Sequence, residues 1–458
     1  MDIKTIKTIE SATEKSLSSF AKLSFSLLFL LAVFHWTYSS HGKVPDNTFL
    51  IIGAIFGAYM ALNIGANDVA NNVGPAVGAR ALTLTGAIII AAIFESAGAI
   101  IAGGDVVNTI KSGIINPNLI TDKNSFIWAM TAGLLAGAVW LNFATSIGAP
   151  VSTTHAIVGG VMGAGIASAG FSILNWGSLA EIASSWVISP LLGGIVAAGF
   201  LYFIKKQIVY KENMIEQAQK FVPILIAIMT WAFTTYLILK GLKQLVNISF
   251  LFASGISLLF AFVAYYITKK SIDKNLSNLS NDRSSVNKLF TPALIFGAAL
   301  LSFAHGANDV SNAIGPLAAI NDAIMHGGTS VKASVPFWIM VVGAIGIVIG
   351  LILYGPRLIK TVGSEITELD QMRAFSVAMA TAVTVIIASQ MGLPVSSTHI
   401  AIGGVFGVGF LREALDMTEK NYVQDIREKF KKHKKELEKL KADLFKLESL
   451  KDKNKSTY

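Results

Sequence analysis

The sequence predicts an all-α polytopic membrane protein with about twelve transmembrane segments, and its composition is the first support. Of 458 residues, 53% are hydrophobic and only 14% are charged, whereas ordinary soluble domains carry about 25% charged residues. The mean hydropathy is +0.59. Several apolar runs exceed the roughly 18 residues that a helix needs to cross a bilayer. A soluble protein is therefore excluded. The lack of cysteine also excludes disulfides and thiolate metal sites.

Each apolar run is expected to form a helix that spans or re-enters the membrane. Glycine is frequent in these runs, with 40 in the chain, and small residues let membrane helices approach closely. The predicted segments are residues 20–40, 47–66, 81–104, 126–147, 150–170, 178–204, 221–240, 249–268, 290–308, 333–356, 371–391 and 395–415.

Basic residues indicate how the segments are oriented, because cytoplasmic loops are enriched in Lys and Arg. Four basic residues lie in residues 1–22, four in 205–220, five in 269–288 and thirteen after residue 415. All four regions, and hence both termini, are predicted to be cytoplasmic. The net charge of +9 is concentrated there, so it indicates membrane topology and not a nucleic-acid partner.

Two pairs of motifs recur in the same order, which is the second support for the fold class. Residues 65–76 read GANDVANNVGPA, and residues 306–317 read GANDVSNAIGPL. Residues 148–163 read GAPVSTTHAIVGGVMG, and residues 392–407 read GLPVSSTHIAIGGVFG. The offsets, 241 and 244, are nearly equal, and the matched positions are polar or conformationally special. We infer an internal duplication.

The two halves are predicted to be inverted in the membrane, because the first starts after one crossing and the second directly after a cytoplasmic loop. Inverted repeats are typical of secondary transporters, which hold their substrate near the midplane between broken or re-entrant helices. The predicted parts are an N-terminal tail and first helix (1–46), repeat 1 (47–170), intervening helices with a short cytoplasmic loop (171–289), repeat 2 (290–415) and a charged helical tail (416–458).

The tail carries apolar residues at the a and d positions of a heptad, which predicts either a surface helix or a self-associating one. These residues are Ile426, Phe430, Leu437, Leu440, Leu444 and Leu447.

The repeated Asn-Asp motif predicts a cation site. Asp68 and Asn71, like Asp309 and Asn312, are three residues apart and share a helix face. Burying a carboxylate at membrane depth costs about 3 kcal/mol or more, and the following Gly-Pro pairs suggest a broken helix or turn with exposed carbonyls. These hard oxygen ligands suit an alkali cation, and helix capping is the alternative. The candidate cation ligands are Ala66, Asn67, Asp68, Asn71, Ala307, Asn308, Asp309 and Asn312.

The second motif predicts an anion site. Proline, a cluster of hydroxyl residues and a Gly-rich run follow one another at 150–163 and 394–407, a pattern typical of a helix start. Free N–H groups, the positive end of the helix dipole and hydroxyl donors would converge there. Two such starts could grip one tetrahedral oxyanion from both sides. Ordinary Ser/Thr capping is the alternative.

Several titratable residues are candidates for coupling. Glu95 lies mid-helix and could bind a coupling ion, carry a proton or pair structurally. His155 and His399 are duplicated and could contact the anion or a proton, although buried histidines are as often satisfied by carbonyls. His305 lies four residues before Asp309, a pair that alone is weak evidence for a metal. Walker A, G-x-S-x-G and H-E-x-x-H sequences are absent, which predicts no enzyme activity and transport driven by an ion gradient.

GANDVAN followed by PVSTTH, in both halves, resembles the inorganic phosphate transporter (PiT) family of sodium- or proton-coupled phosphate symporters, which includes sulfate permeases. The resemblance covers about 47–170 and 290–415. It implies a twelve-helix inverted-repeat fold with paired half-helices and a central phosphate site, and Glu95 matches a family glutamate. The phosphate ligands that we expect on this basis are Asp68, Asn108, Thr109, Ser152, Thr153, Thr154, Asp309, Ser396, Ser397 and Thr398.

The expected function is import of inorganic phosphate driven by sodium, which is a co-substrate bound by the Asp and Asn residues; no cofactor is expected. Proton coupling, sulfate transport and an uncoupled anion channel are the alternatives. The resemblance implies a large hydrophilic central loop in animal members of the family, and the corresponding loop here is only residues 269–289. This difference suggests a prokaryotic form, and hence the plasma (cell inner) membrane. Segments outside the repeats and the heptad tail offer surfaces for a homodimer.

Overall fold

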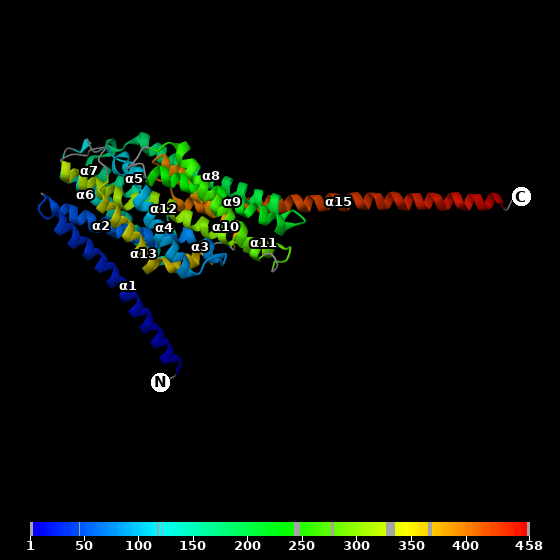
Figure 1. Cartoon of the computed structure of the whole chain (residues 1–458), viewed down its shortest axis with the longest axis horizontal. Helices are drawn as coiled ribbons and strands as arrows, with labels where there is room; N and C mark the ends of the chain where they lie inside the picture. Colours follow the sequence, from blue (N-terminus) through cyan, green and yellow to red (C-terminus); the bar gives the residue numbers. More distant parts are fainter. Residues whose placement is uncertain are drawn as a thin grey trace. The chain divides into compact units, whose positions relative to one another are not determined.

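The computed structural model describes residues 3–44, 46–116, 119–120, 122–241, 248–275, 279–326, 335–364 and 369–455. Their regular structure is helical, apart from one isolated bridge between Ile115 and Leu174, which confirms the all-α prediction. The long helices of the first half (Figure 1) are α1 (Ile3–His41), α2 (Asn47–Asn67), α3 (Val69–Gly78), α4 (Leu84–Ala102), α6 (Lys123–Ile147), α7 (Thr153–Ala169) and α8 (Trp176–Ile204). The remaining long helices are α9 (Met214–Gly241), α10 (Phe250–Asn275), α12 (Thr291–His326), α13 (Phe337–Ser364), α14 (Gln371–Gln390) and α15 (Ser397–Lys455).

Short helical turns join these helices. They are α5 (Gly104–Asn108), the π-helical turn η1 (Thr109–Gly113), the 3-10 turn η3 (Phe171–Ile173), the π-helical turn η4 (Lys205–Val209) and α11 (Arg283–Leu289). Helix α6 begins after Asp122, which accepts a hydrogen bond from the Ser125 backbone N–H. Hydrogen bonds from the Ser125 backbone and hydroxyl hold the pKa of the Asp122 carboxyl below its usual range.

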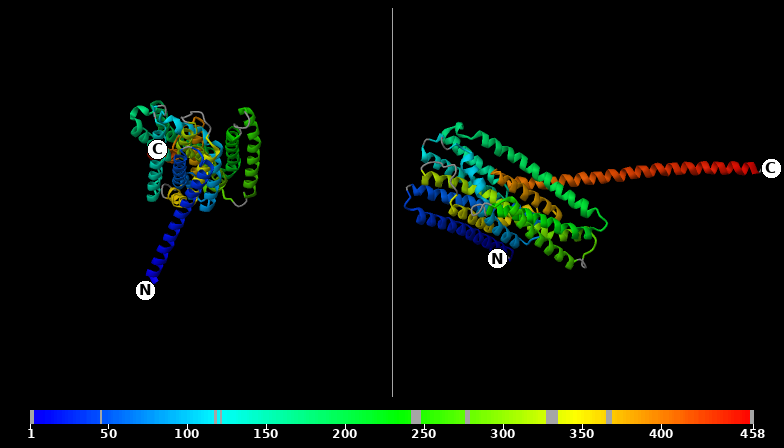
Figure 2. Two further views of the ribbon diagram at one scale, coloured as in Figure 1. Left: turned by 90° about the vertical axis from the view of Figure 1, so that its left-hand side faces the viewer. Right: turned by 45° about the horizontal axis from the view of Figure 1, so that its top comes forward.

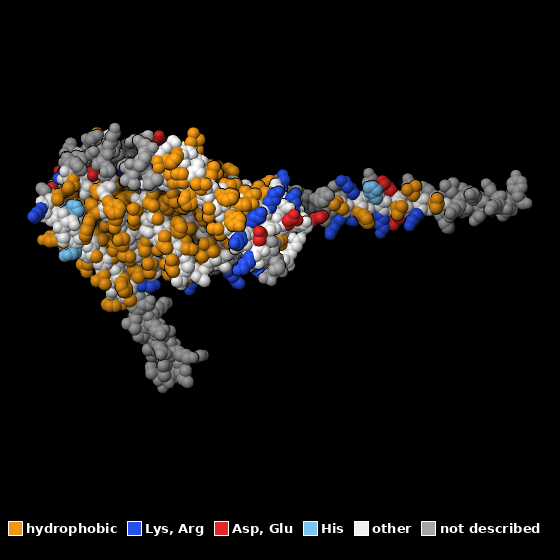
Figure 3. All heavy atoms as spheres, viewed as in Figure 1, with side chains coloured by type: hydrophobic (Ala, Val, Ile, Leu, Met, Phe, Trp, Pro, Cys, Tyr) orange, Lys and Arg blue, Asp and Glu red, His pale blue; other side chains and the backbone are white. Residues whose placement is uncertain are grey.

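Ten helical stretches among the described residues are long and apolar enough to cross a membrane. They are Ser19–His41, Asn47–Gly78, Leu84–Ala102, Lys123–Ile147, Trp176–Val209, Met214–Gly241, Phe250–Lys274, Thr291–Met325, Phe337–Gly363 and Gln371–Gln390. Two predicted segments, 150–170 and 395–415, correspond to α7 and to the first part of α15. The count of twelve therefore stays a prediction. Exposed apolar side chains cover much of the visible face of the helix bundle (Figure 3).

The chain divides into two compact units, Met1–Val408 and Gly409–Tyr458. In the first, α12 packs against α2, α4, α6 and α14, while α13 packs against α2, α3 and α4. Helices α9 and α10 pack against each other as a pair (Figure 2). The described residues of the second unit, 409–455, belong to helix α15.

Equivalent glycines mark the same packing in the two halves. A Cβ added at Gly65 on α2 would lie 1.8 Å from the carbonyl oxygen of Ile347 on α13. A Cβ added at Gly306, the matching glycine on α12, would lie 2.2 Å from the carbonyl oxygen of Glu95 on α4. The α2–α13 contact thus corresponds to the α12–α4 contact, and Ile347 occupies the place of Glu95. This supports duplication, while inversion in the membrane stays a prediction.

The predicted helix break occurs in the first repeat only and falls at Asp68, because the Gly74-Pro75 pair lies inside α3. In the first, α2 ends at Asn67 and α3 begins at Val69, although the Asp68 N–H still bonds to the Ile64 carbonyl at 2.9 Å. In the second, α12 continues through residues 306–317 with Pro316 inside it, so the prediction of a break there was wrong. Membrane helices tolerate an internal proline when neighbouring groups satisfy the freed backbone.

Candidate functional site

The four repeated motifs meet in the interior of the Met1–Val408 unit. Asp68 lies between α2 and α3, and Asp309 lies within α12. Helices α7 and α15 begin at Thr153 and Ser397, as the proline and hydroxyl pattern predicts. The Thr154 hydroxyl donates to the Val395 carbonyl at 2.9 Å. The two helix starts, more than 240 residues apart in sequence, are therefore in direct contact.

Hydroxyl groups from both helix starts surround the two aspartates. Thr153 donates to Asp68 Oδ2 at 2.6 Å, and Thr398 donates to Asp68 Oδ1 at 3.1 Å. Ser397 donates to Asp309 Oδ2 at 3.2 Å. All five side chains are at least 98% buried, so each aspartate is held away from water by the predicted anion-binding hydroxyls.

Two asparagines cross from one repeat to the other. Asn71 donates to the Thr398 hydroxyl at 2.8 Å. Asn312 donates to the hydroxyls of Thr153 and Thr154, each at 3.2 Å. Each asparagine thus contacts the helix start of the opposite repeat, so the cation motif of one half and the anion motif of the other form one network.

Asn67 and Asn308 hold the loops that precede the two helix starts. Asn67 Nδ2 donates to Thr145 Oγ1 at 2.9 Å and to the Ala149 carbonyl at 3.0 Å, and its Oδ1 accepts from the Val151 N–H at 3.0 Å. Asn308 Nδ2 donates to Ser389 Oγ and to the Leu393 carbonyl. These asparagines therefore position the loops as well as offering oxygen ligands.

Among the predicted cation ligands on α12, three acceptor oxygens have no hydrogen-bond donor in the described part of the chain: Asn308 Oδ1, Asp309 Oδ1 and Asn312 Oδ1. All are buried. A buried acceptor without a donor costs about 1–3 kcal/mol, so the three oxygens are suited to a ligand that brings positive charge. The matching oxygens of Asn67 and Asp68 accept hydrogen bonds from the protein.

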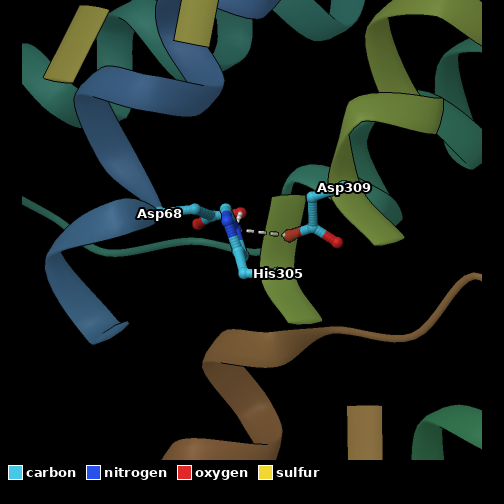
Figure 4. Close-up of side chains that lie close together, drawn as sticks. All are labelled: Asp68, His305 and Asp309. Atoms are coloured by element: carbon cyan, nitrogen blue, oxygen red, sulfur yellow. Dashed lines mark ion pairs between the residues drawn. The ribbon is translucent and has the colours of Figure 1, made fainter. Parts of the chain in front are cut away.

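A histidine lies between the two aspartates, which sequence reasoning treated as weak evidence. His305 Nε2 is 2.8 Å from Asp309 Oδ2 and 3.9 Å from Asp68 Oδ2. Figure 4 shows the imidazole on α12 directed between the two carboxylates. Ligand atoms of these three buried residues lie within 4.8 Å of one another, close enough to share one metal ion.

Glu95 contacts the other ring nitrogen of His305. Its Oε2 lies 2.7 Å from His305 Nδ1, and its Oε1 accepts a hydrogen bond from Asn72 at 2.6 Å. Both Glu95 and His305 are 0% exposed. Three buried carboxyl groups, those of Glu95, Asp68 and Asp309, therefore surround one imidazole.

The remaining candidates lie at the margins of this cluster. Ser152 and Ser396 cap α7 and α15 by accepting from the N–H groups of His155 and His399. The two histidine rings contact each other, with 4.9 Å between centroids. His155 Nδ1 also lies 2.5 Å from the Ser152 hydroxyl.

Four predicted ligands do not join the cluster through their side chains. Asn108 is exposed, and Thr109 donates to the Gly392 carbonyl at 2.6 Å, in the loop before α15. Ala66 and Ala307 lie inside α2 and α12. In an α-helix, each backbone carbonyl normally accepts a hydrogen bond from the N–H group four residues later.

The comparisons with known proteins agree with this architecture. The sequence profile described as "Phosphate transporter family" matches residues 64–435. A Helicobacter pylori (strain J99) protein that carries the name of a phosphate permease is 54% identical over 423 residues, which is 91% of this chain and 78% of that protein. A Haemophilus influenzae protein with the same name is 39% identical over 376 residues, 80% of this chain and 89% of that protein.

A solved structure gives the same result. The chain named "The sodium-dependent phosphate transporter" superposes with a TM-score of 0.76 at 36% identity. The match covers 82% of this chain and 93% of the solved one. On its sequence, its helical architecture and these matches, this multi-pass membrane protein belongs to the phosphate transporter family, a family of transporters and not of enzymes.

Proposed function

We propose that the protein is a secondary active symporter that imports inorganic phosphate with sodium. The observation that carries the proposal is the combination of three buried carboxyl groups around one imidazole and three donor-less oxygens beside two helix starts. Carboxylates at membrane depth require a compensating partner, and the solved structure similar to this chain is named for sodium dependence.

Sodium would bind mainly along α12. Asn308, Asp309 and Asn312 each present an unsatisfied oxygen, a set of hard ligands that suits an alkali cation. Asp68, Asn71 and the backbone carbonyls near Ala66 and Ala307 are the further proposed ligands. The first-half oxygens already accept hydrogen bonds, so we expect the second half to bind the more tightly held ion.

Phosphate would bind between the starts of α7 and α15, where N–H groups and hydroxyls converge. In the structure, Thr153, Ser397 and Thr398 donate their protons to Asp68 and Asp309. A sodium ion on a carboxylate would take the place of those donors, and the hydroxyls could then turn toward the phosphate oxygens. Binding of cation and anion would be mutually dependent, as coupled transport requires.

Translocation would proceed by alternating access of the two repeats. The bonds from Asn71 to Thr398 and from Asn312 to Thr153 join opposite repeats, and movement of one repeat past the other would have to exchange them. We further propose that both termini are cytoplasmic, that the protein lies in the plasma membrane and that it forms a homodimer.

The test is uptake of radiolabelled phosphate into proteoliposomes with an inward sodium gradient, repeated with potassium at constant pH. We expect concentrative uptake only with sodium. Asp68→Asn and Asp309→Asn should abolish this uptake. Lys206→Gln is the control and should leave uptake unchanged, because Lys206 lies over the Tyr202 ring at the end of α8 and not in the central cluster. Wild-type, sodium-dependent uptake by both aspartate variants would overturn the mechanism.

Proton coupling is a second candidate because Glu95 and His305 form a buried pair next to Asp309. It predicts concentrative uptake in potassium that follows the pH gradient. A sulfate permease would show competition by excess sulfate, and an uncoupled channel would carry phosphate only down its gradient.

A further inference from the structure

A cavity lies outside the central cluster, between α1 and the helices of the transport repeats. Its volume is about 550 Å³, and residues of α1, α2, α6 and α13 line it. The family profile matches from residue 64, so the wall that α1 provides lies outside the segment that defines the family. None of the candidate residues discussed so far except Ala66 lines this cavity.

The charged side chains that line the cavity are both basic. Lys22 on α1 and Arg357 on α13 both line it, and none of its described lining residues is acidic. Lys22 Nζ lies 6.0 Å from the centre of the Tyr354 ring. Arg357 Nη1 donates to the Ser146 carbonyl at 3.1 Å, which fixes the guanidinium and leaves further N–H donors for a ligand.

Hydroxyl groups stand beside the cations. Ser26 and Tyr354, one from each wall, lie 3.1 Å apart. Two cations, several hydroxyls and no carboxylate form a set that recognises an oxyanion, because guanidinium and ammonium groups form charge-assisted hydrogen bonds with phosphate oxygens.

The residues that line the cavity indicate where a phosphate group would come from. Leu23 and Leu27 on α1 line the cavity and are 53% and 50% exposed, as expected of an opening toward lipid. Ala66 and Thr145 line it as well, and Thr145 accepts a hydrogen bond from Asn67 at the edge of the central cluster. The basic-loop pattern predicts that Lys22 and Arg357 are both on the cytoplasmic side, where basic pockets between helices bind lipid headgroups.

We infer that this cavity is a binding site for a phosphate group held by Lys22 and Arg357. The group is carried either by an anionic phospholipid of the inner leaflet or by inorganic phosphate next to the central site. The inference does not rest on the proposed function, because it concerns binding and not transport.

The test measures thermal unfolding of the full chain in detergent with three probes: inorganic phosphate, dioctanoyl phosphatidylglycerol and dioctanoyl phosphatidylcholine. A ligand that binds only the folded state raises the melting temperature. We expect the phosphatidylglycerol or phosphate shift to weaken in Lys22→Gln and Arg357→Gln, with half-saturation at least about tenfold higher. Lys206→Gln is the matched control, since Lys206 also lies over a tyrosine, at 5.6 Å, and does not line the cavity.

The three probes distinguish a phospholipid headgroup from free inorganic phosphate. A shift with phosphatidylglycerol but not phosphatidylcholine that requires Lys22 and Arg357 identifies a lipid. A shift with inorganic phosphate that persists in Asp309→Asn and requires the same two residues identifies free phosphate. Lys22→Arg, which keeps the positive charge, should retain binding, and a cooperative unfolding transition without ligand shows that each Gln variant is folded. If neither shift depends on Lys22 or Arg357, the inference is wrong, whatever the uptake assay shows.

Discussion

Glu95 and His305 form a buried pair, with 2.7 Å between Oε2 and Nδ1, that joins α4 to α12. The repeat relationship places Ile64 at the position of His305 and, by the glycine contacts, Ile347 at the position of Glu95. A polar pair that joins the two repeats, between α4 and α12, thus has two isoleucines as its counterpart between α13 and α2. The two equivalent contacts between the repeats are therefore electrically unequal, and the titratable pair lies on the α12 side of the cluster.

Replacing Glu95 with Gln should reduce sodium-driven phosphate uptake at least about tenfold. The amide can still accept from Asn72, so the loss would report the missing charge beside His305. Uptake into proteoliposomes at several sodium concentrations measures it. Glu181→Gln is the control, because Glu181 is exposed on α8. Wild-type uptake and sodium dependence in Glu95→Gln would exclude a coupling role.

Asn312→Ala should raise the sodium concentration for half-maximal uptake at least about tenfold. The change removes an unpartnered oxygen and the donor to Thr153 and Thr154, so a cation ligand and a cross-repeat bond are lost together. Sodium titrations of uptake provide the measurement. Asn321→Ala, which removes another buried asparagine from α12, controls for a general packing defect. Equal sodium dependence in the two variants would argue against a sodium site at Asn312.

The repeated motifs made much of this cluster predictable. Asp68, Asn71 and Thr153 have counterparts in the second half, and a polar residue duplicated within an apolar sequence is expected at the interface between the halves. The helix starts followed from proline and hydroxyl residues, since their capping chemistry is local.

The positions of residues that have no counterpart in the other repeat were harder to predict. Glu95 and His305 are 210 residues apart, and only the packing of α4 against α12 brings them together. The continuity of α12 past Pro316 also depends on neighbouring helices, because the sequence alone reads Gly-Pro as a break. Asn108 shows the converse: a polar residue near a helix end proved to be exposed.

Lys111 and Asp322 form an ion pair between η1 and α12 in which both side chains are at most 3% exposed. Lys111→Met should lower the melting temperature strongly, because breaking a buried pair leaves an uncompensated charge and costs about 3–5 kcal/mol. The double variant Lys111→Met with Asp322→Leu should recover much of the loss, since an apolar pair can replace a buried ion pair. Thermal unfolding in detergent measures both. Equal destabilisation of single and double variants would contradict this account.

Self-association through the tail is the last expectation. In the Gly409–Tyr458 unit, α15 continues as a helix and exposes Leu437 and Leu444, which lie on the predicted heptad stripe. If the stripe pairs two chains, Leu437→Asp with Leu444→Asp should convert a dimer into a monomer in analytical ultracentrifugation of the full chain in detergent. Lys435→Asp, an exposed position off the stripe, should leave the dimer intact. Because the tail lies outside both repeats, phosphate uptake should persist in the monomer, and a dimer that survives the leucine changes would assign association to the membrane helices instead.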